Sequence, residues 1–425
     1  MAKAKKPKVA KIRKTKPVNN FLLFTILSIF QLITGFIASN SFEVFDSRII
    51  VTMAMLVVVE WAYLLAFYKF FYRRNFELEA IAFFLSGVGF VTIGSINPDA
   101  VIKQFILMVV GVILFIFMVA IMGNVDLCMK LRVFVAIGAI ALLLVNLITA
   151  KATHGARNWI GIGPFRLQPS EFVKVAFIFV GSATLAKIQT SKNIFAFIGF
   201  SIACVGTLIL IKDFGTGLIF FMTFLIIAFM NSGDIKTIIL AVASAVMGAG
   251  IVLKYKSYVL KRFSVYRHVW ENAYESGFQQ TRVLVGMASG GLLGLGIGNG
   301  NVRNIFASTS DLIFGVICEE WGYIFGIAVV LSFVFIAISA LLNSIAARST
   351  FYSIAAVAGA GMLLFQAGLN IFGITDLLPL TGVTLPFVSQ GGSSMICCWG
   401  VLAFIKASDV RTYNYLGGAK KKWKQ

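Results

Sequence analysis

Residues 104–122 read QFILMVVGVILFIFMVAIM, nineteen positions without a charged side chain. A helix of that length is about 30 Å long, which matches the hydrocarbon core of a bilayer. Eleven more apolar runs lie at 21–39, 49–68, 78–95, 131–149, 171–188, 194–211, 214–230, 237–253, 311–342, 351–373 and 390–407. A mean hydropathy of +0.91 over 425 residues is too apolar for one soluble core. The sequence therefore predicts an all-α polytopic membrane protein with about twelve spans.

Positive charge is concentrated at the two ends of the chain. Eight Lys and Arg residues lie in residues 1–16 and six in residues 406–425. An even number of spans places both tails on one side of the membrane, and their basic character assigns that side to the cytoplasm. Such tails are typical of orientation signals and of contacts with anionic lipid. Without a nucleic-acid-binding module they predict no nucleic-acid partner.

Four segments then fall at the outer face of the membrane. They are residues 150–170, 212–217, 254–310 and 375–389. The first and third carry basic side chains against the usual bias, including Arg157 and Arg262. Two explanations remain open: an anionic ligand at the outer leaflet, or pairing with local acids and lipid phosphates.

The first outer segment ends in HGARNWIGIGPFRLQPSEFVK (residues 154–174). Its prolines and glycines exclude a continuous helix, and Ser170 predicts a cap for a span that begins at Glu171. Glu171 and Lys174 then share one helical face and predict an ion pair. Alternatively, Arg157 and Lys174 are cations that hold phosphate oxygens at the membrane rim.

Further acidic residues adjoin the spans. The stretch IKDFGTG contains Asp213, which is either a helix cap or a site carboxylate. The stretch DLIFGVICEEWG starts at Asp311, and helical geometry places Glu319 and Glu320 about 12 Å farther along. Acids at that depth are paired or face water, so a functional role is predicted for them.

Two stretches rich in glycine and proline indicate interrupted helices. GGLLGLGIGNG (residues 290–300) lacks the strand and helix context of a dinucleotide site, and tight packing of a re-entrant or surface-lying helix explains it better. LLPLTGVTLPFVSQGGSS (residues 377–394) breaks the backbone at membrane depth, where only protein or a water-filled cavity can cover it. This stretch therefore predicts a pocket wall.

Taken in order, these stretches resemble the SEDS family of shape, elongation, division and sporulation proteins (FtsW, RodA and SpoVE). The matching residues are GARNWIGIGPFRLQPSEFVK, DFGTG, GFQQTR, SGGLLGLGIGNG, SDLIFGVICEEWG and LLPLTGVTLPFVSQGGSS. The resemblance covers residues 76–408 and implies a core of about ten transmembrane helices, with the large extracellular loop 254–310 inside it. Residues 21–75 are then an extra N-terminal transmembrane hairpin, and residues 1–20 and 409–425 are basic cytoplasmic tails.

The resemblance implies an enzyme of cell-wall synthesis, a glycosyltransferase of the bacterial cytoplasmic membrane. Its substrate is lipid II, the undecaprenyl-pyrophosphate-linked disaccharide-peptide, which is polymerised into glycan strands at the outer face. The implied partners are a class B penicillin-binding transpeptidase and other division or elongation membrane proteins. The sequence does not separate roles in division, shape and sporulation.

This chemistry requires a base for the attacking sugar hydroxyl and positive charge for the departing pyrophosphate. The candidate substrate-binding residues are Arg157, Lys174, Asp213, Arg262, Gln279, Arg282, Asp311, Glu319 and Ser393. No organic cofactor and no protein metal site is predicted. A divalent cation, Mg or Mn, is an alternative source of charge for the leaving group.

The base is the point at which this chain departs from the family. WENAYESGFQQ (residues 270–280) aligns with the family pattern WEDPxGSGYQ, and Asn272 stands at its presumed catalytic Asp. An amide does not accept a proton at neutral pH. Glu271 or Glu275 can supply the base if the loop re-aims its side chain, which gives a working polymerase.

Two alternatives remain open. The first is a SEDS-type scaffold or regulator with weak or no polymerase activity, which follows from the amide at Asn272. The second is a lipid-linked precursor flippase, which follows from the acids at Glu319 and Glu320. A flippase needs those two acids, whereas a polymerase is most sensitive in the 270s.

Overall fold

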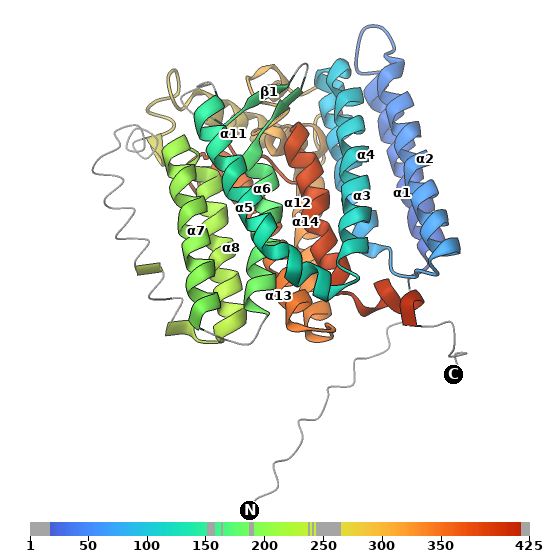
Figure 1. Ribbon diagram of the computed structural model, residues 1–425. Helices are drawn as coiled ribbons and strands as arrows, with labels where there is room; N and C mark the ends of the chain where they lie inside the picture. Colours follow the sequence, from blue (N-terminus) through green and yellow to red (C-terminus); the bar gives the residue numbers. More distant parts are fainter. Residues whose placement is uncertain are drawn as a thin grey trace, which may run out of the picture.

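The computed structural model describes residues 18–150, 158–162, 165–186, 191–236, 239, 242–243 and 265–417. These residues form a bundle of helices that stand side by side (Figure 1). The helices are α1 Asn20–Ser39, α2 Ser47–Phe70, α3 Glu77–Ile96, α4 Pro98–Ile121, α5 Val125–Thr149, α6 Pro169–Leu185, α7 Ser191–Ile211, α8 Phe214–Ser232, α11 Phe278–Gly290, α12 Ile313–Ile345, α13 Thr350–Ile374 and α14 Gly392–Ser408, with the short 3-10 helices η1 Val302–Asn304 and η2 Val410–Gly417.

Nine of the described helices are long and apolar enough to cross a membrane, and α14 is a shorter apolar helix. Eleven of the twelve predicted apolar runs coincide with a described helix; the run 237–253 lies largely outside the described residues. The prediction of an all-helical polytopic membrane protein is therefore confirmed.

Helix α14 lies at the centre of the bundle. Every residue from Ser393 to Ser408 is buried, as expected of a helix that is apolar on all sides. The ring of Trp399 packs against the rings of Phe83 and Phe115, at centroid distances of 4.8 and 5.7 Å. These contacts bring α3 and α4 against α14 and fix the part of the bundle from which the site is built.

The hairpin formed by α1 and α2 packs against α3 and α12. Gln31 Nε2 donates to Glu60 Oε1 at 2.6 Å, and both side chains are buried. Gly87 of α3 faces this pair, because a Cβ there would lie 3.1 Å from Gln31 Nε2. The ring of Phe30 stacks on that of Phe325 in α12, with centroids 6.0 Å apart. Polar and aromatic contacts together attach the hairpin to the rest of the bundle.

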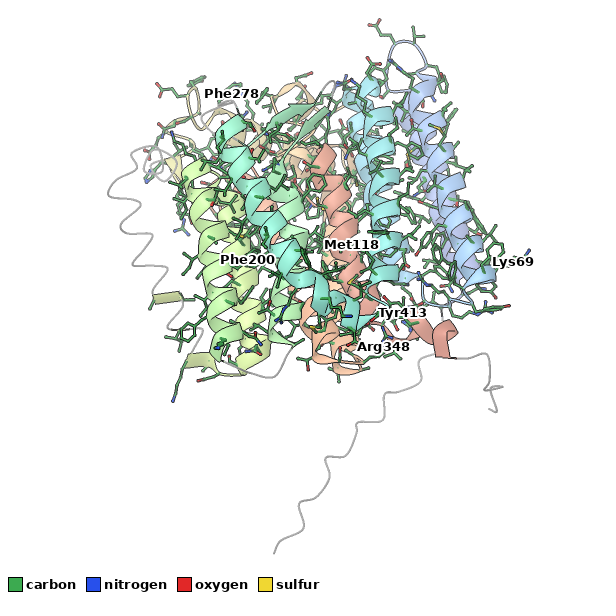
Figure 2. All side chains as sticks on the ribbon, in the orientation of Figure 1. Lys69, Met118, Phe200, Phe278, Arg348 and Tyr413 are labelled. Atoms are coloured by element: carbon green, nitrogen blue, oxygen red, sulfur yellow. The ribbon has the colours of Figure 1, made fainter. Side chains whose placement is uncertain are left out.

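The beginning and the end of the described chain lie at the same end of the bundle, here called the tail end. Asn20 Nδ2 donates to the carbonyl of Arg74, and Asn75 Nδ2 donates to Asp409 Oδ2 at 2.6 Å. Lys69 and Arg348 also lie at this end, opposite Phe278 (Figure 2). The sequence predicts an even number of spans, and an even number places both ends of the chain on the same side of the membrane.

The tail end is held by a buried ion pair. Lys406 Nζ lies 2.7 Å from Glu79 Oε1, with side chains 1% and 0% exposed. Tyr63 donates its hydroxyl to the same carboxylate at 2.9 Å. Helices α2, α3 and α14 therefore share one polar contact below the apolar core.

The opposite end, here called the cavity end, carries irregular structure. Strands β1 Ile160–Ile162 and β2 Phe165–Leu167 form an antiparallel hairpin there (Figure 1). Helix α6 then starts at Pro169, with Gln168 as its N-cap, so the predicted start at Glu171 with Ser170 as cap is wrong by two residues. Proline suits the first helical position because its fixed φ is helical and its missing N–H needs no partner there.

Helix α11 is re-entrant. It runs beside the first turns of α12, since a Cβ at Gly290 would lie 2.5 Å from the carbonyl oxygen of Cys318. Helix α12 is interrupted at Gly322 (φ 83°, ψ 168°), and the amides of Leu295 and Gly296 donate there to the carbonyls of residues 319 and 320 at 3.0 and 2.9 Å. The segment formed by α11 and the turns after it therefore reaches the level of Gly322, about 14 Å along α12 from its first residue, before it turns back.

Two details differ from the sequence predictions. The glycine stretch is helical only as far as Gly290, and its remaining residues form the returning turns. Asp311 precedes α12 in a turn, so the predicted helical spacing between it and Glu319 is wrong. Glycine at positive φ, as at Gly294 and Gly298, lets the return pass close to α12.

Candidate functional site

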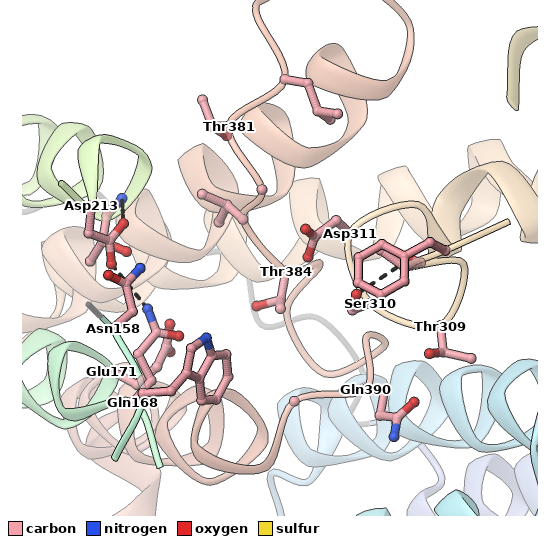
Figure 3. Close-up of a pocket in the computed structure, with 18 of the residues that line it drawn as sticks. Asn158, Gln168, Glu171, Asp213, Thr309, Ser310, Asp311, Thr381, Thr384 and Gln390 are labelled. Atoms are coloured by element: carbon pink, nitrogen blue, oxygen red, sulfur yellow. Dashed lines mark hydrogen bonds between the residues drawn. The ribbon is translucent and has the colours of Figure 1, made fainter. Parts of the chain in front are cut away.

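A cavity of about 1220 Å³ opens at the cavity end (Figure 3). Its wall includes residues from all four segments that the sequence places at the outer face, together with residues 100–107 of α4. The charged residues of its described wall are Lys103, Glu171, Lys212, Asp213 and Asp311. The predicted pocket wall is present, because residues 379–384 and 390–392 form one side of the cavity.

Asp213 is both a helix cap and a cavity residue. It precedes α8, and its Oδ1 accepts the backbone N–H of Thr216 at 3.1 Å. Its Oδ2 accepts Nε2 of Gln168 at 3.1 Å (Figure 3). Burial raises the pKa of the Asp213 carboxyl above its ordinary value, whereas the hydrogen bonds from Thr216 lower it. The two roles left open by the sequence are therefore compatible.

Gln168 connects Asp213 to the central helix. Its backbone N–H donates to Oγ of Ser393, the second residue of α14, at 3.1 Å. Ser393 is fully buried and is not part of the cavity wall, so it supports Gln168 from behind. Gln168 was not identified from the sequence, because its partner Asp213 is 45 residues away.

Glu171 and Lys174 form the predicted ion pair. Lys174 Nζ lies 2.6 Å from Glu171 Oε2, and the side chains are 3% and 5% exposed. Only Glu171 reaches the cavity wall. Lys174 also donates to Oε1 of Gln366 at 2.8 Å, and Gln366 donates to the carbonyl of Thr384 at 2.9 Å. Lys174 thus lies behind the wall and holds Glu171.

Side-chain amides satisfy the unwound backbone of residues 375–391. Asn370 Nδ2 donates to the carbonyls of Asp311 and Val383 at 2.8 and 2.7 Å. Gln104 Nε2 donates to the carbonyl of Ser389 at 3.1 Å. Internal partners of this kind stabilise irregular backbone wherever protein, and not water, covers it. A polar amide inside an apolar run is the sequence signal that could have identified Gln104 and Asn370.

The segment 268–277 lies at one edge of the cavity, where Ser276 and Gln279 contribute to the wall. Glu271, Asn272 and Glu275 do not line the cavity. Glu271 is 75% exposed, and its Oε1 lies 3.1 Å from His268 Nδ1. Glu275 is also exposed. The Asn272 amide donates to the carbonyl of His268 at 2.9 Å, back toward its own turn.

Two further predicted site residues, Arg282 and Glu319, lie apart from the cavity wall. Arg282 places its guanidinium 5.4 Å from the centre of the Phe278 ring. Glu319 is buried and accepts the backbone N–H groups of Asn301 and Val302 at 2.9 and 2.8 Å. Glu319 therefore holds the return of the re-entrant segment. Arg157 and Arg262 lie outside the described residues.

A protein-built metal centre is not evident in the described part of the chain. No group of three His, Cys, Asp or Glu residues within it gathers closely enough to hold an ion. The three wall carboxylates are Glu171, Asp213 and Asp311, and the first is paired with Lys174. A divalent cation that binds with the substrate stays a prediction.

The family model for FtsW, RodA and SpoVE, described as a cell cycle protein, matches residues 80–413. The chain belongs to this family. Helices α1 and α2 precede the residues that the family model matches.

Named relatives fit this membership. "Stage V sporulation protein E" of Bacillus subtilis (strain 168) is 33% identical over 264 residues, covering 59% of this chain and 71% of that protein. "Probable peptidoglycan glycosyltransferase FtsW" of Saccharophagus degradans is 29% identical over 356 residues, covering 79% of this chain and 92% of that protein. Relatives of this SEDS protein are therefore named as peptidoglycan glycosyltransferases.

Solved structures share the fold. A chain described under "Structural coordination of polymerization and crosslinking by a peptidoglycan synthase complex" has a TM-score of 0.66 at 20% identity, covering 82% of this chain and 99% of that chain. The crystal structure of Thermus thermophilus rod shape determining protein RodA gives a TM-score of 0.57 at 20% identity, covering 78% and 95%. This SEDS protein thus has a RodA-like fold.

Proposed function

We propose that this SEDS protein is a peptidoglycan glycosyltransferase that polymerises lipid II, and that the cavity binds the lipid-linked sugar. The observation that carries the proposal is the cavity itself, which combines three carboxylates and two lysines at one end of a membrane bundle. An open, polar site at the end of apolar helices suits a substrate with a lipid tail and a polar sugar head. The names of the relatives support the same reaction.

The reaction transfers a sugar from pyrophosphate to a hydroxyl group. The acceptor oxygen forms a bond to the anomeric carbon, the bond from that carbon to the pyrophosphate oxygen breaks, and a base takes the hydroxyl proton. We assign the base to Glu275 first and to Glu271 second. Glu275 adjoins Ser276 of the cavity wall, whereas Glu271 is engaged with His268.

Cations stabilise the departing pyrophosphate in this proposal. Lys103 and Lys212 are the cations of the described wall. Arg157 and Arg262 adjoin the same segments in the sequence and are assigned the same task. Positive charge that faces the leaving group stabilises the transition state more strongly than it stabilises the ground state.

The proposed setting is the bacterial cytoplasmic membrane, with the cavity end outside and both tails in the cytoplasm. The basic tails support this orientation through the positive-inside rule. A class B penicillin-binding transpeptidase is the proposed partner. The similarity of fold to a chain of a peptidoglycan synthase complex supports that partner.

One observation favours a second candidate function. Asn272 stands at the position of the family's presumed catalytic Asp, and its amide is already bonded to His268. A protein that binds lipid II without polymerising it, as a scaffold or regulator, follows from that amide. The flippase alternative has less support, because neither Glu319 nor Glu320 lines the cavity.

The test separates binding from polymerisation. Purified protein in lipid nanodiscs, alone and with its candidate transpeptidase, is given radiolabelled lipid II, and both bound lipid II and glycan chains are measured. The glycosyltransferase proposal predicts binding and chains. Binding without chains under every pairing supports the scaffold, and the absence of binding contradicts both candidates. Glu43→Ala, an exposed acid in the α1–α2 turn, is the matched control for acid variants in the 270s.

A further inference from the structure

We propose that Asn272 is a positioning residue whose side-chain amide fixes the turn 268–277 beside the cavity, so that a carboxylate cannot take its place in this chain. The inference rests on the proposed function only in assigning that turn to the site. The inference gives a different explanation for Asn272 at the position where the family pattern has an Asp. The amide is then a required hydrogen-bond donor rather than a disabled base.

Four hydrogen bonds converge on Asn272. Its backbone N–H and its side-chain Nδ2 both donate to the carbonyl of His268, at 3.3 and 2.9 Å. Its own carbonyl accepts the N–H groups of Glu275 and Gly277, both at 3.0 Å. A turn of ten residues is therefore organised around one residue that donates twice and accepts twice.

The turn is closed tightly on itself. A Cβ at Gly277 would lie 2.4 Å from the carbonyl oxygen of Val269 and 3.0 Å from that of Asn272, so only glycine fits. Val269 is buried beneath the turn at 1% exposure. A shift of the Asn272 carbonyl would therefore move Gly277 as well.

The turn continues directly into the cavity wall. The N–H of Thr281 donates to the carbonyl of Gly277 at 3.0 Å, which begins α11. Ser276 and Gln279 lie on either side of Gly277, and both line the cavity. The position of the wall at this edge thus depends on the bonds that Asn272 makes.

A carboxylate cannot reproduce the side-chain bond. The Asn272 side-chain nitrogen faces a carbonyl oxygen at 2.9 Å, and an ionised carboxylate has no proton to donate. Two acceptors at that distance repel each other, so Asn272→Asp weakens the turn unless its side chain is protonated. The other charged or titratable groups of the turn are His268, Glu271, Tyr274 and Glu275. Arg267 precedes the turn, and Asp376 from the 375–391 segment accepts its N–H at 3.2 Å.

Hydrogen–deuterium exchange of residues 268–281 in nanodiscs tests the inference. For Asn272→Asp, exchange relative to wild type is expected to rise about fivefold or more at pH 7 and to return toward wild type near pH 4. For Asn272→Ala, a smaller rise is expected that does not depend on pH. The comparison is repeated in a Glu271→Gln background, so that titration of that carboxylate does not produce the effect.

A matched control comes from the first helix. Asn40 Nδ2 donates to the carbonyl of Phe36 at 2.9 Å, with the same spacing of four residues, in a turn that is not part of the cavity wall. Asn40→Asp is expected to leave exchange of residues 268–281 unchanged. A general response of the bundle to a new acid would change it.

Two outcomes overturn the inference. One is wild-type exchange of the turn in Asn272→Asp at every pH. The other is a gain of lipid II polymerisation by Asn272→Asp, because the position would then be a vacated base. Wild-type protein that makes no glycan chains while the exchange pattern holds contradicts the proposed function and leaves this inference standing.

Discussion

The Lys174 ammonium lies 2.6 Å from the Glu171 carboxylate, and both side chains are buried, Glu171 in the cavity wall and Lys174 behind it. Removing one partner leaves the other charged group buried without compensation, which typically costs about 3–5 kcal/mol. We therefore expect Lys174→Met to lower the thermal stability of the purified protein strongly. The double variant Glu171→Gln, Lys174→Met should recover part of the loss. Equal stability of Lys174→Met and wild type would show that the pair is not buried as described.

Asp213 makes stability depend on pH. Because burial raises the pKa of its carboxyl above the ordinary 3.8, the folded state binds more protons than the unfolded state. The contribution of Asp213 to the free energy of unfolding is therefore complete below about pH 4 and is lost as the pH rises through the pKa of the folded state. The melting temperatures of wild type and Asp213→Asn, which retains a capping side chain, are compared from pH 4 to pH 7. As the pH rises, the melting temperature of wild type should fall relative to that of Asp213→Asn. A difference in melting temperature that stays constant would show that the pKa of Asp213 is not raised in the folded state.

The interruption of α12 requires glycine at position 322. Gly322 has φ 83°, and a Cβ there would lie 2.3 Å from the carbonyl oxygen of Leu292. Gly322→Ala should therefore destabilise the protein by about 1–3 kcal/mol or more and loosen the re-entrant segment. Gly138→Ala in α5, where no atom lies within 4 Å of the added Cβ, is the matched control and should be close to neutral. Similar melting temperatures for the two variants would refute the described interruption.

The hairpin α1–α2 depends on the contact between Gln31 and Glu60. Gln31 Nε2 donates to Glu60 Oε1 at 2.6 Å, and Glu60 Oε2 is buried without a hydrogen-bond partner. Gln31→Leu should destabilise the protein by about 1–3 kcal/mol, since it leaves an acid without its donor. The double variant Gln31→Leu, Glu60→Leu should lose less. Additive losses in this double-mutant cycle would show that the two residues do not interact.

The fold could be predicted because span length is set by bilayer thickness. Each apolar run of about twenty residues must be a helix, since its backbone has no other partners in lipid. The break at Gly322 could not be predicted in this way. It lies within one apolar run, and only the distant amides of Leu295 and Gly296 reveal why the helix stops.

The site could be predicted only in part. Residues from the four outer segments meet around one cavity, and Asp213, Asp311 and Gln279 line it. The sequence did not identify Gln168 or Gln366, because each acts through a partner that is distant along the chain or presented by unwound backbone. Nor could it show which way the side chains of the 270s point. Glu271 and Glu275 do not line the wall in the structure, and a match of sequence patterns contains no information on side-chain position.

Polymerisation of lipid II by Glu275→Gln, compared with wild type and with Glu271→Gln, tests the central claim most directly. Glutamine keeps the size of the side chain and removes only the base. The account predicts that wild type makes glycan chains, that Glu275→Gln loses about 100-fold or more in rate, and that Glu271→Gln loses much less. Equal rates for Glu275→Gln and wild type, with equal bound lipid II, would contradict the assignment of the base to Glu275.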